Sequence, residues 1–101
     1  MIKKQFLKSK PVCKVTFTLT AEAATDAKNV ELVGDFSKWS ESPIKMKKTK
    51  SGEFKTTVDL AKGQNYEFRY LIDGKKWAND WEADAYVPNK MTFEENSVVS
   101  L

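Results

Sequence analysis

Alternation of apolar and polar residues is the dominant pattern of this chain. Apolar side chains alternate with threonines over residues 15–20, and the same period of two returns in 54–60 and 66–72. A period of two places successive side chains on opposite faces of a β-strand, so each segment predicts a strand with one buried face. The residues expected to build the core are Cys13, Val15, Phe17, Leu19, Phe54, Val58, Leu60, Tyr66, Phe68, Tyr70 and Ile72.

Turn residues separate these segments. Asp73-Gly74 is a strong hairpin signal, because tight primed turns need a positive φ that glycine adopts without steric cost. Shorter apolar runs at 30–32, 44–46 and 96–101, with a return strand that begins at Lys76 and Trp77, bring the expected total to about seven strands, and there is no apolar stripe of helical period. The pattern therefore predicts an all-β protein, a β-sandwich of short antiparallel strands.

The length of the chain fits one domain. Its 101 residues match the commonest domain size, and we expect residues 12–101 to form a single domain after a flexible N-terminal segment at 1–11. Residues 78–95 lose the alternation, which predicts a long surface loop. The N-terminal residues contain no apolar run of the kind found in signal peptides or membrane spans. We expect a cytoplasmic protein without membrane contact.

Candidate catalytic groups are few. The chain has no histidine and one cysteine, so thiol catalysis and the usual zinc sites are not expected. Asp80, Glu82 and Asp84 form an acidic cluster of the type that hydrolyses sugars or binds calcium, but a solvated loop is the favoured interpretation. We therefore expect no enzymatic activity, no metal and no cofactor.

The charge of the chain is only mildly basic, with a formal net charge of +3. Lysines cluster at 45–50, but the alternation places Lys45 and Lys47 on the solvent face of a strand, where lysines protect sheet edges. Dedicated nucleic-acid binders have a denser positive field, so we expect no nucleic-acid partner.

The three tryptophans do not all fit the buried faces of the predicted strands. Trp39 lies in a serine-rich turn, Trp77 follows the Asp73-Gly74 turn, and Trp81 lies in an acidic segment. An exposed indole suits the apolar face of a pyranose ring, while nearby amide and guanidinium groups bind hydroxyls. The alternative is that each tryptophan fills an end of the sandwich, and the residues alone leave both interpretations open.

Three motifs, in order, resemble carbohydrate-binding module family 48. They are VELVGDFSKWS at 30–40, GEFKTTVDLAKGQNYEFRYLIDGKKW at 52–77 and NSVV at 96–99. This family includes the glycogen-binding domain of the AMP-activated kinase β subunit and the N-terminal domains of isoamylases and branching enzymes. The resemblance runs from about Val15 to the C-terminus. It implies an immunoglobulin-like (early-set) β-sandwich that binds α-1,4-linked glucans without catalysis.

The resemblance also implies roles for particular residues. Two tryptophans would stack on sugar rings, a basic residue and an asparagine would bind hydroxyls, and Phe93 or Met91 would push into the ring of a curved glucan. The implied carbohydrate-binding residues are Trp39, Arg69, Trp77, Asn96 and Phe93. The alternation agrees independently for Arg69, because it places this residue on the face opposite to Phe68, free to serve a ligand.

A second hypothesis is a protein-interaction domain with the same fold that does not bind sugar. Exposed strand edges and aromatic loops also suit docking to an enzyme or to a second copy of the chain. The expected partner is an α-glucan polysaccharide or oligosaccharide, with a glucan-processing enzyme or a kinase as a further expected partner.

Overall fold

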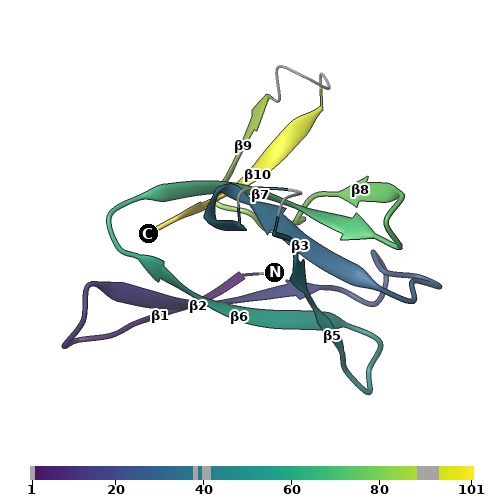
Figure 1. The fold of residues 1–101 in the computed structure, drawn as a ribbon, viewed down its shortest axis with the longest axis horizontal. Coiled ribbons are helices and arrows are strands. Elements are labelled where there is room, and N and C mark those ends of the chain that lie inside the picture. The colour runs from purple at the N-terminus through teal and green to yellow at the C-terminus, as the bar shows by residue number, and fades with distance from the viewer. Residues whose placement is uncertain (1, 38, 40–41, 89–93) are drawn as a thin grey trace.

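The computed structural model describes residues 2–37, 39, 42–88 and 94–101. These residues form ten β-strands and one short 3-10 helix, shown in Figure 1. In chain order they are β1 Ile2–Phe6, β2 Val12–Leu19, β3 Val30–Gly34, η1 Asp35–Ser37, β4 Ile44–Lys45, β5 Lys47–Lys48, β6 Phe54–Ala61, β7 Asn65–Ile72, β8 Lys76–Ala78, β9 Ala85–Pro88 and β10 Glu95–Ser100. In these ranges no helix has the length and apolar character of a membrane span.

The strands form two antiparallel sheets that pack face to face (Figure 1). Sheet A has the order β1-β2-β6-β5, and sheet B has the order β4-β3-β7-β10-β9, with β8 also paired to β7. The chain passes from sheet B to sheet A between β4 and β5. This arrangement confirms the predicted all-β class and the immunoglobulin-like sandwich.

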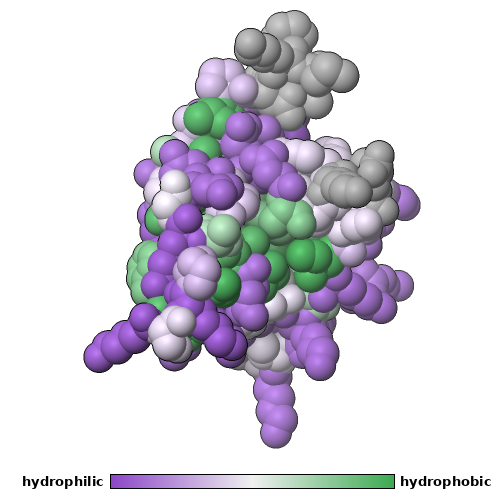
Figure 2. Space-filling model, turned by 60° about the vertical axis from the view of Figure 1, so that its left-hand side comes forward, coloured by the Kyte–Doolittle hydropathy of each residue, from purple (hydrophilic) through white to green (hydrophobic). Residues whose placement is uncertain are grey.

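The core lies between the inner faces of the two sheets, as the alternation predicts. Phe17 of β2 and Phe68 of β7 are both fully buried, and their ring centroids lie 4.9 Å apart in an edge-to-face arrangement. Cys13 is a buried free thiol, and it packs in the same cluster as a small apolar residue. Figure 2 shows that hydrophobic residues also gather at the centre of one side of the molecule, surrounded by hydrophilic residues.

Two segments differ from the sequence prediction. Residues 2–6, expected to be flexible, form β1 at the edge of sheet A, and residues 85–88, expected to lie in a loop, form β9 beside β10. Lys4 interrupts the apolar alternation of β1, since its position opposite Val15 faces the core. Its Nζ instead reaches across the edge to Asp84, 2.7 Å from Oδ2, so an ion pair joins the two sheets.

The β7–β8 hairpin turns where the sequence predicts. Asp73 and Gly74 both have positive φ, 52° and 68°, as the two central residues of a primed turn require. The Asp73 Oδ1 atom also accepts hydrogen bonds from the backbone N–H groups of Asn29 and Lys28, at 2.8 and 2.9 Å. These two bonds lower the pKa of the Asp73 carboxyl from its ordinary value.

Gly34 ends β3 where there is no room for a side chain. A Cβ atom there would lie 2.6 Å from the backbone oxygen of Glu67 and 2.9 Å from Cβ of Phe68. Both contacts are shorter than van der Waals distance, and one is to backbone, which cannot rotate away. The glycine therefore allows β3 and β7 to approach closely at the point where the chain turns into η1.

We expect Gly34→Ala to lower the free energy of unfolding by about 1–3 kcal/mol, because β3 must move away from β7. Urea unfolding followed by circular dichroism measures this change. Gly63→Ala is the control, since a Cβ atom at Gly63 meets no other atom within 4 Å and costs only the strain of its positive φ. A Gly34→Ala variant as stable as wild type would contradict the close approach.

The ion pair between the sheets predicts a pH dependence of stability. Partial burial acts to raise the pKa of Asp84, but hydrogen bonds from Lys4 and from the backbone N–H of Ser100 outweigh it and hold the pKa below its ordinary value. A carboxyl with a lowered folded pKa stabilises the protein above its unfolded pKa, and this contribution is lost as the pH falls through the folded pKa. We therefore expect Asp84→Asn to be less stable than wild type near pH 7, with the difference shrinking as the pH falls through and below the ordinary range of an aspartate carboxyl. Urea unfolding across this range measures it, and a constant difference would contradict the assignment.

Candidate functional site

The turn after β3 is held by its own side chains. Ser37 accepts a hydrogen bond from the backbone N–H of Gly34 at 3.0 Å and donates one to the carbonyl of the same residue at 3.1 Å. Asp35 accepts the backbone N–H of Glu67 at 2.8 Å, which ties the turn to β7. The turn is therefore fixed against the centre of sheet B.

Trp39 follows this turn in an unusual backbone conformation. Its φ is 55°, a left-handed value that is rare for an aromatic residue and costs about 1–3 kcal/mol. The indole Nε1–H donates to Asp35 Oδ1 at 3.0 Å, and the side chain is half-buried. Since the same Asp35 binds Glu67, the indole of Trp39 is linked through one carboxylate to β7.

The outer face of sheet B carries polar residues that alternate with the core residues of β7. Glu67 accepts a hydrogen bond from Asn96 Nδ2 at 3.1 Å, which joins β7 to β10. Asn96 is only 4% exposed. In the antiparallel pairing of β10 with β7, Ser97 stands opposite Phe68. Asn96, the residue before Ser97, therefore lies beside Arg69.

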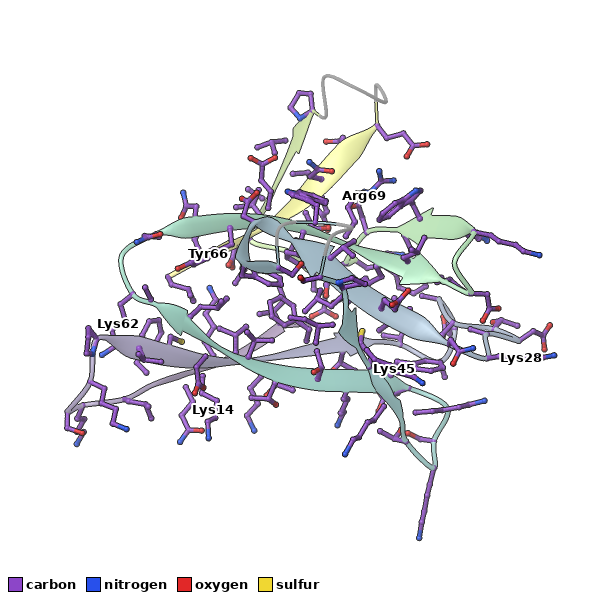
Figure 3. All side chains as sticks on the ribbon, in the orientation of Figure 1. Lys14, Lys28, Lys45, Lys62, Tyr66 and Arg69 are labelled. Atoms are coloured by element: carbon purple, nitrogen blue, oxygen red, sulfur yellow. The ribbon has the colours of Figure 1, made fainter. Side chains whose placement is uncertain are left out.

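Arg69 lies beneath Trp77 on this outer face. The guanidinium carbon is 5.1 Å from the centroid of the indole, and Nη2 forms an ion pair with Glu94. Figure 3 marks Arg69 above sheet B, between β10 and β8. Arg69 is 5% exposed whereas Trp77 is 40% exposed, so the indole covers the cation and keeps its own outer surface in solvent. An arginine under an aromatic ring is a favourable cation–π arrangement that holds the ring in one plane.

Four of the predicted residues lie around β7: Trp77 covers Arg69, Asn96 stands beside Arg69, and Trp39 is linked through Asp35 to the backbone N–H of Glu67. Phe93, and Met91 as its alternative, lie outside the described residues. Arg69 lies on the outer face, as the alternation predicts, where Trp77 covers it and Glu94 pairs with it.

A family model for the glycogen recognition site of AMP-activated protein kinase matches residues 16–98. The chain belongs to this family. The match begins in β2 and ends in β10, so it includes all four residues gathered around β7. Members of this glycogen-recognition family are carbohydrate-binding modules, which bind glycogen without catalysing a reaction on it. No curated protein matches the chain significantly.

A buried polar network, which the sequence did not indicate, holds the segment after Trp77 in the glycogen-recognition domain. Tyr70 donates its hydroxyl to Asp80 Oδ2 at 2.7 Å, and the backbone N–H of Asp80 donates to Ser97 at 2.9 Å. Asp80 is 1% exposed. Burial, together with this carboxylate, raises the pKa of Tyr70 well above its ordinary value. The network anchors the return segment of the hairpin to β7 and β10.

Asp80 and Asp84 of the acidic cluster noted in the sequence therefore form hydrogen bonds and an ion pair within the fold. Asp80 Oδ1 accepts the backbone N–H of Glu82 at 2.8 Å, and Asp84 pairs with Lys4 and accepts the backbone N–H of Ser100. Within the described ranges, no group of three histidine, cysteine, aspartate or glutamate residues is placed to hold a metal ion.

We expect Asp80→Ala to cost about 2–4 kcal/mol of unfolding free energy, because it leaves the buried Tyr70 hydroxyl and the backbone N–H of Glu82 without their acceptor. Thermal and urea unfolding measure the loss. Glu82→Ala, at an exposed neighbouring position, is the control and is expected to change stability by no more than about 0.5 kcal/mol. Equal stabilities of the two variants would contradict the assigned role of Asp80.

Proposed function

We propose that this domain binds α-1,4-linked glucan, as glycogen, starch or maltooligosaccharide, on the outer face of sheet B without catalysis. The observation that carries the proposal is the indole of Trp77, which is 40% exposed and lies 5.1 Å over the guanidinium of Arg69. Membership of the glycogen-recognition family supports the ligand class.

The physical basis of the proposal is a preoriented apolar surface. The C–H faces of a pyranose ring pack against a flat indole and release water from both surfaces. An unsupported tryptophan on a surface hairpin would lose side-chain entropy when the sugar binds. Arg69 reduces this loss, because it fixes the plane of Trp77 from beneath before the ligand arrives. Trp39, held by Asp35, supplies the second indole of the proposed platform.

Hydrogen bonds would set the register of the sugar on the platform. We assign them to Arg69 and Asn96, which both adjoin the Trp77 side of β7 and have guanidinium and amide groups that suit hydroxyls. Arg69 Nε is buried, so we assign the sugar contact to the Nη groups, of which Nη2 reaches the exposed Glu94. The Glu94 side chain is 59% exposed, so the Arg69–Glu94 ion pair lies at the solvent boundary, where we propose that sugar hydroxyls bind.

The proposed site is open rather than enclosed. An open surface that contacts a few sugar rings gives weak binding, with a Kd of about micromolar to millimolar. Such affinity suits a polymer, since many equivalent sites on one glucan raise the effective concentration.

We expect Trp77→Ala to weaken maltoheptaose binding at least about tenfold, because stacking on one aromatic ring is worth roughly 1–3 kcal/mol. Titration followed by intrinsic tryptophan fluorescence measures the Kd. Trp81→Ala is the matched control, because Trp81 is another exposed indole, four positions along the chain and 62% exposed. It is expected to leave the Kd within about twofold of wild type.

Two results would count against the proposal. If wild-type protein shows no fluorescence change and no retention on amylose beads at millimolar sugar, the domain is better described as a docking domain that does not bind sugar. If wild type binds but Trp77→Ala binds equally well, the sugar lies elsewhere on the molecule.

A further inference from the structure

An open hollow of about 380 Å³ lies at the end of sheet B beside the β7–β8 hairpin. It is lined by Asn29, Glu31, Lys45, Asp73 and Gly74. These residues come from three separate parts of the chain: the entry to β3, the edge strand β4 and the hairpin turn. Figure 3 marks Lys45 on β4, where the chain leaves sheet B.

The strand register connects this hollow to Trp77. Lys45 stands opposite Glu31, Glu31 opposite Leu71, and Leu71 opposite Trp77. Directly opposed residues share a face of the sheet, so these four side chains form one row across the outer face. Neighbouring strands are about 4.8 Å apart, so the row extends roughly 14 Å from Trp77 to Lys45 on the far side of the hollow. The twist of the sheet bends this row, and α-1,4-linked glucans are themselves curved.

The lining of the hollow matches a neutral ligand with many hydroxyl groups. Lys45 offers N–H donors, Glu31 offers acceptors, and the Asn29 side chain offers both. Glu31 and Lys45 are of opposite charge and stand opposite each other, yet no ion pair joins them in the part of the chain that the structure describes. With Asp73, the lining holds one ammonium group and two carboxylates, so it offers both donors and acceptors to hydroxyl groups and no ion pair between Glu31 and Lys45 closes it.

Asp73 adds a fixed acceptor to this lining. Its Oδ1 atom is held by the backbone N–H groups of Lys28 and Asn29, so the carboxylate stays in one orientation. Leu71, partly exposed between the hollow and Trp77, supplies an apolar surface over which a sugar ring can pass.

We infer that this hollow is a second sugar subsite, which receives the continuation of a glucan chain whose neighbouring rings lie on Trp77. The inference rests on the proposed function, since it assigns the hollow to the same ligand. It predicts that the domain distinguishes glucans by length: a short oligosaccharide occupies only the tryptophan platform, whereas a longer one also reaches Glu31 and Lys45.

The test compares maltotriose with maltoheptaose by isothermal titration calorimetry and NMR titration. Glu31→Ala and Lys45→Ala are each expected to weaken maltoheptaose binding about three- to tenfold, the effect of one or two hydrogen bonds, while maltotriose binding stays within about twofold of wild type. Lys47→Ala is the matched control, because it removes an exposed lysine two positions away that lies on sheet A. It is expected to change neither Kd beyond about twofold. Circular dichroism checks that each variant is folded.

The possible results distinguish a failure of the subsite in the hollow from a failure of the tryptophan platform. Unchanged maltoheptaose binding in both variants overturns the subsite, while a Trp77→Ala loss in the same assay would leave the platform standing. An equal loss for both sugar lengths also overturns it, because it would place Glu31 and Lys45 at the platform. If wild type binds neither sugar, the proposed function fails and the subsite fails with it.

Discussion

The stacking of the Trp77 indole on the Arg69 guanidinium is the interaction on which the proposed site depends. A cation that is 5% exposed loses most of its hydration, so it needs compensation from nearby charge or π electrons. Glu94 supplies the charge and Trp77 supplies the ring face. The lower face of the Trp77 indole therefore contacts Arg69, and its upper face is exposed to solvent. An exposed indole face held in this way suits stacking on a sugar ring.

β7 provides the rigidity that this interaction needs. Its inner residues Phe68 and Tyr70 are fully buried, so the strand cannot slide or rotate without opening the core. The outer residues Glu67 and Arg69 are therefore presented in fixed positions. The turn after β3 is bound to β7 through Asp35, and the segment after β8 is bound through the buried pair of Tyr70 and Asp80. Both tryptophans of the proposed platform are thus fixed relative to one strand.

Much of the fold follows from local pattern, because alternation and turn chemistry are local properties. The core strands, the buried Cys13 and the Asp73-Gly74 hairpin were predicted correctly from the sequence. Strands at the edges were harder: β1 contains Lys4, whose inward position is explained only by Asp84, a residue distant in sequence. β9 is a strand because β10 lies beside it, and its own residues give no clear alternation.

The site shows the same division between local and distant information. Alternation alone placed Arg69 on the outer face, and the same reasoning would have found Glu67, two positions earlier, which binds Asn96. It gave no sign that Arg69 would be covered, since Glu94 lies 25 positions away and the approach of Trp77 depends on the hairpin. The buried role of Asp80 was equally hidden, because an aspartate in an acidic segment resembles a solvated turn.

The most direct measurement is the set of side-chain N–H signals in two-dimensional NMR spectra of ¹⁵N-labelled protein during titration with maltoheptaose. The Trp77 indole and the Arg69 guanidinium are predicted to shift together along one binding curve, with the Trp39 indole shifting on the same curve and Trp81 unmoved. Binding that shifts other signals but leaves Trp77 and Arg69 in place would contradict a platform built on their contact.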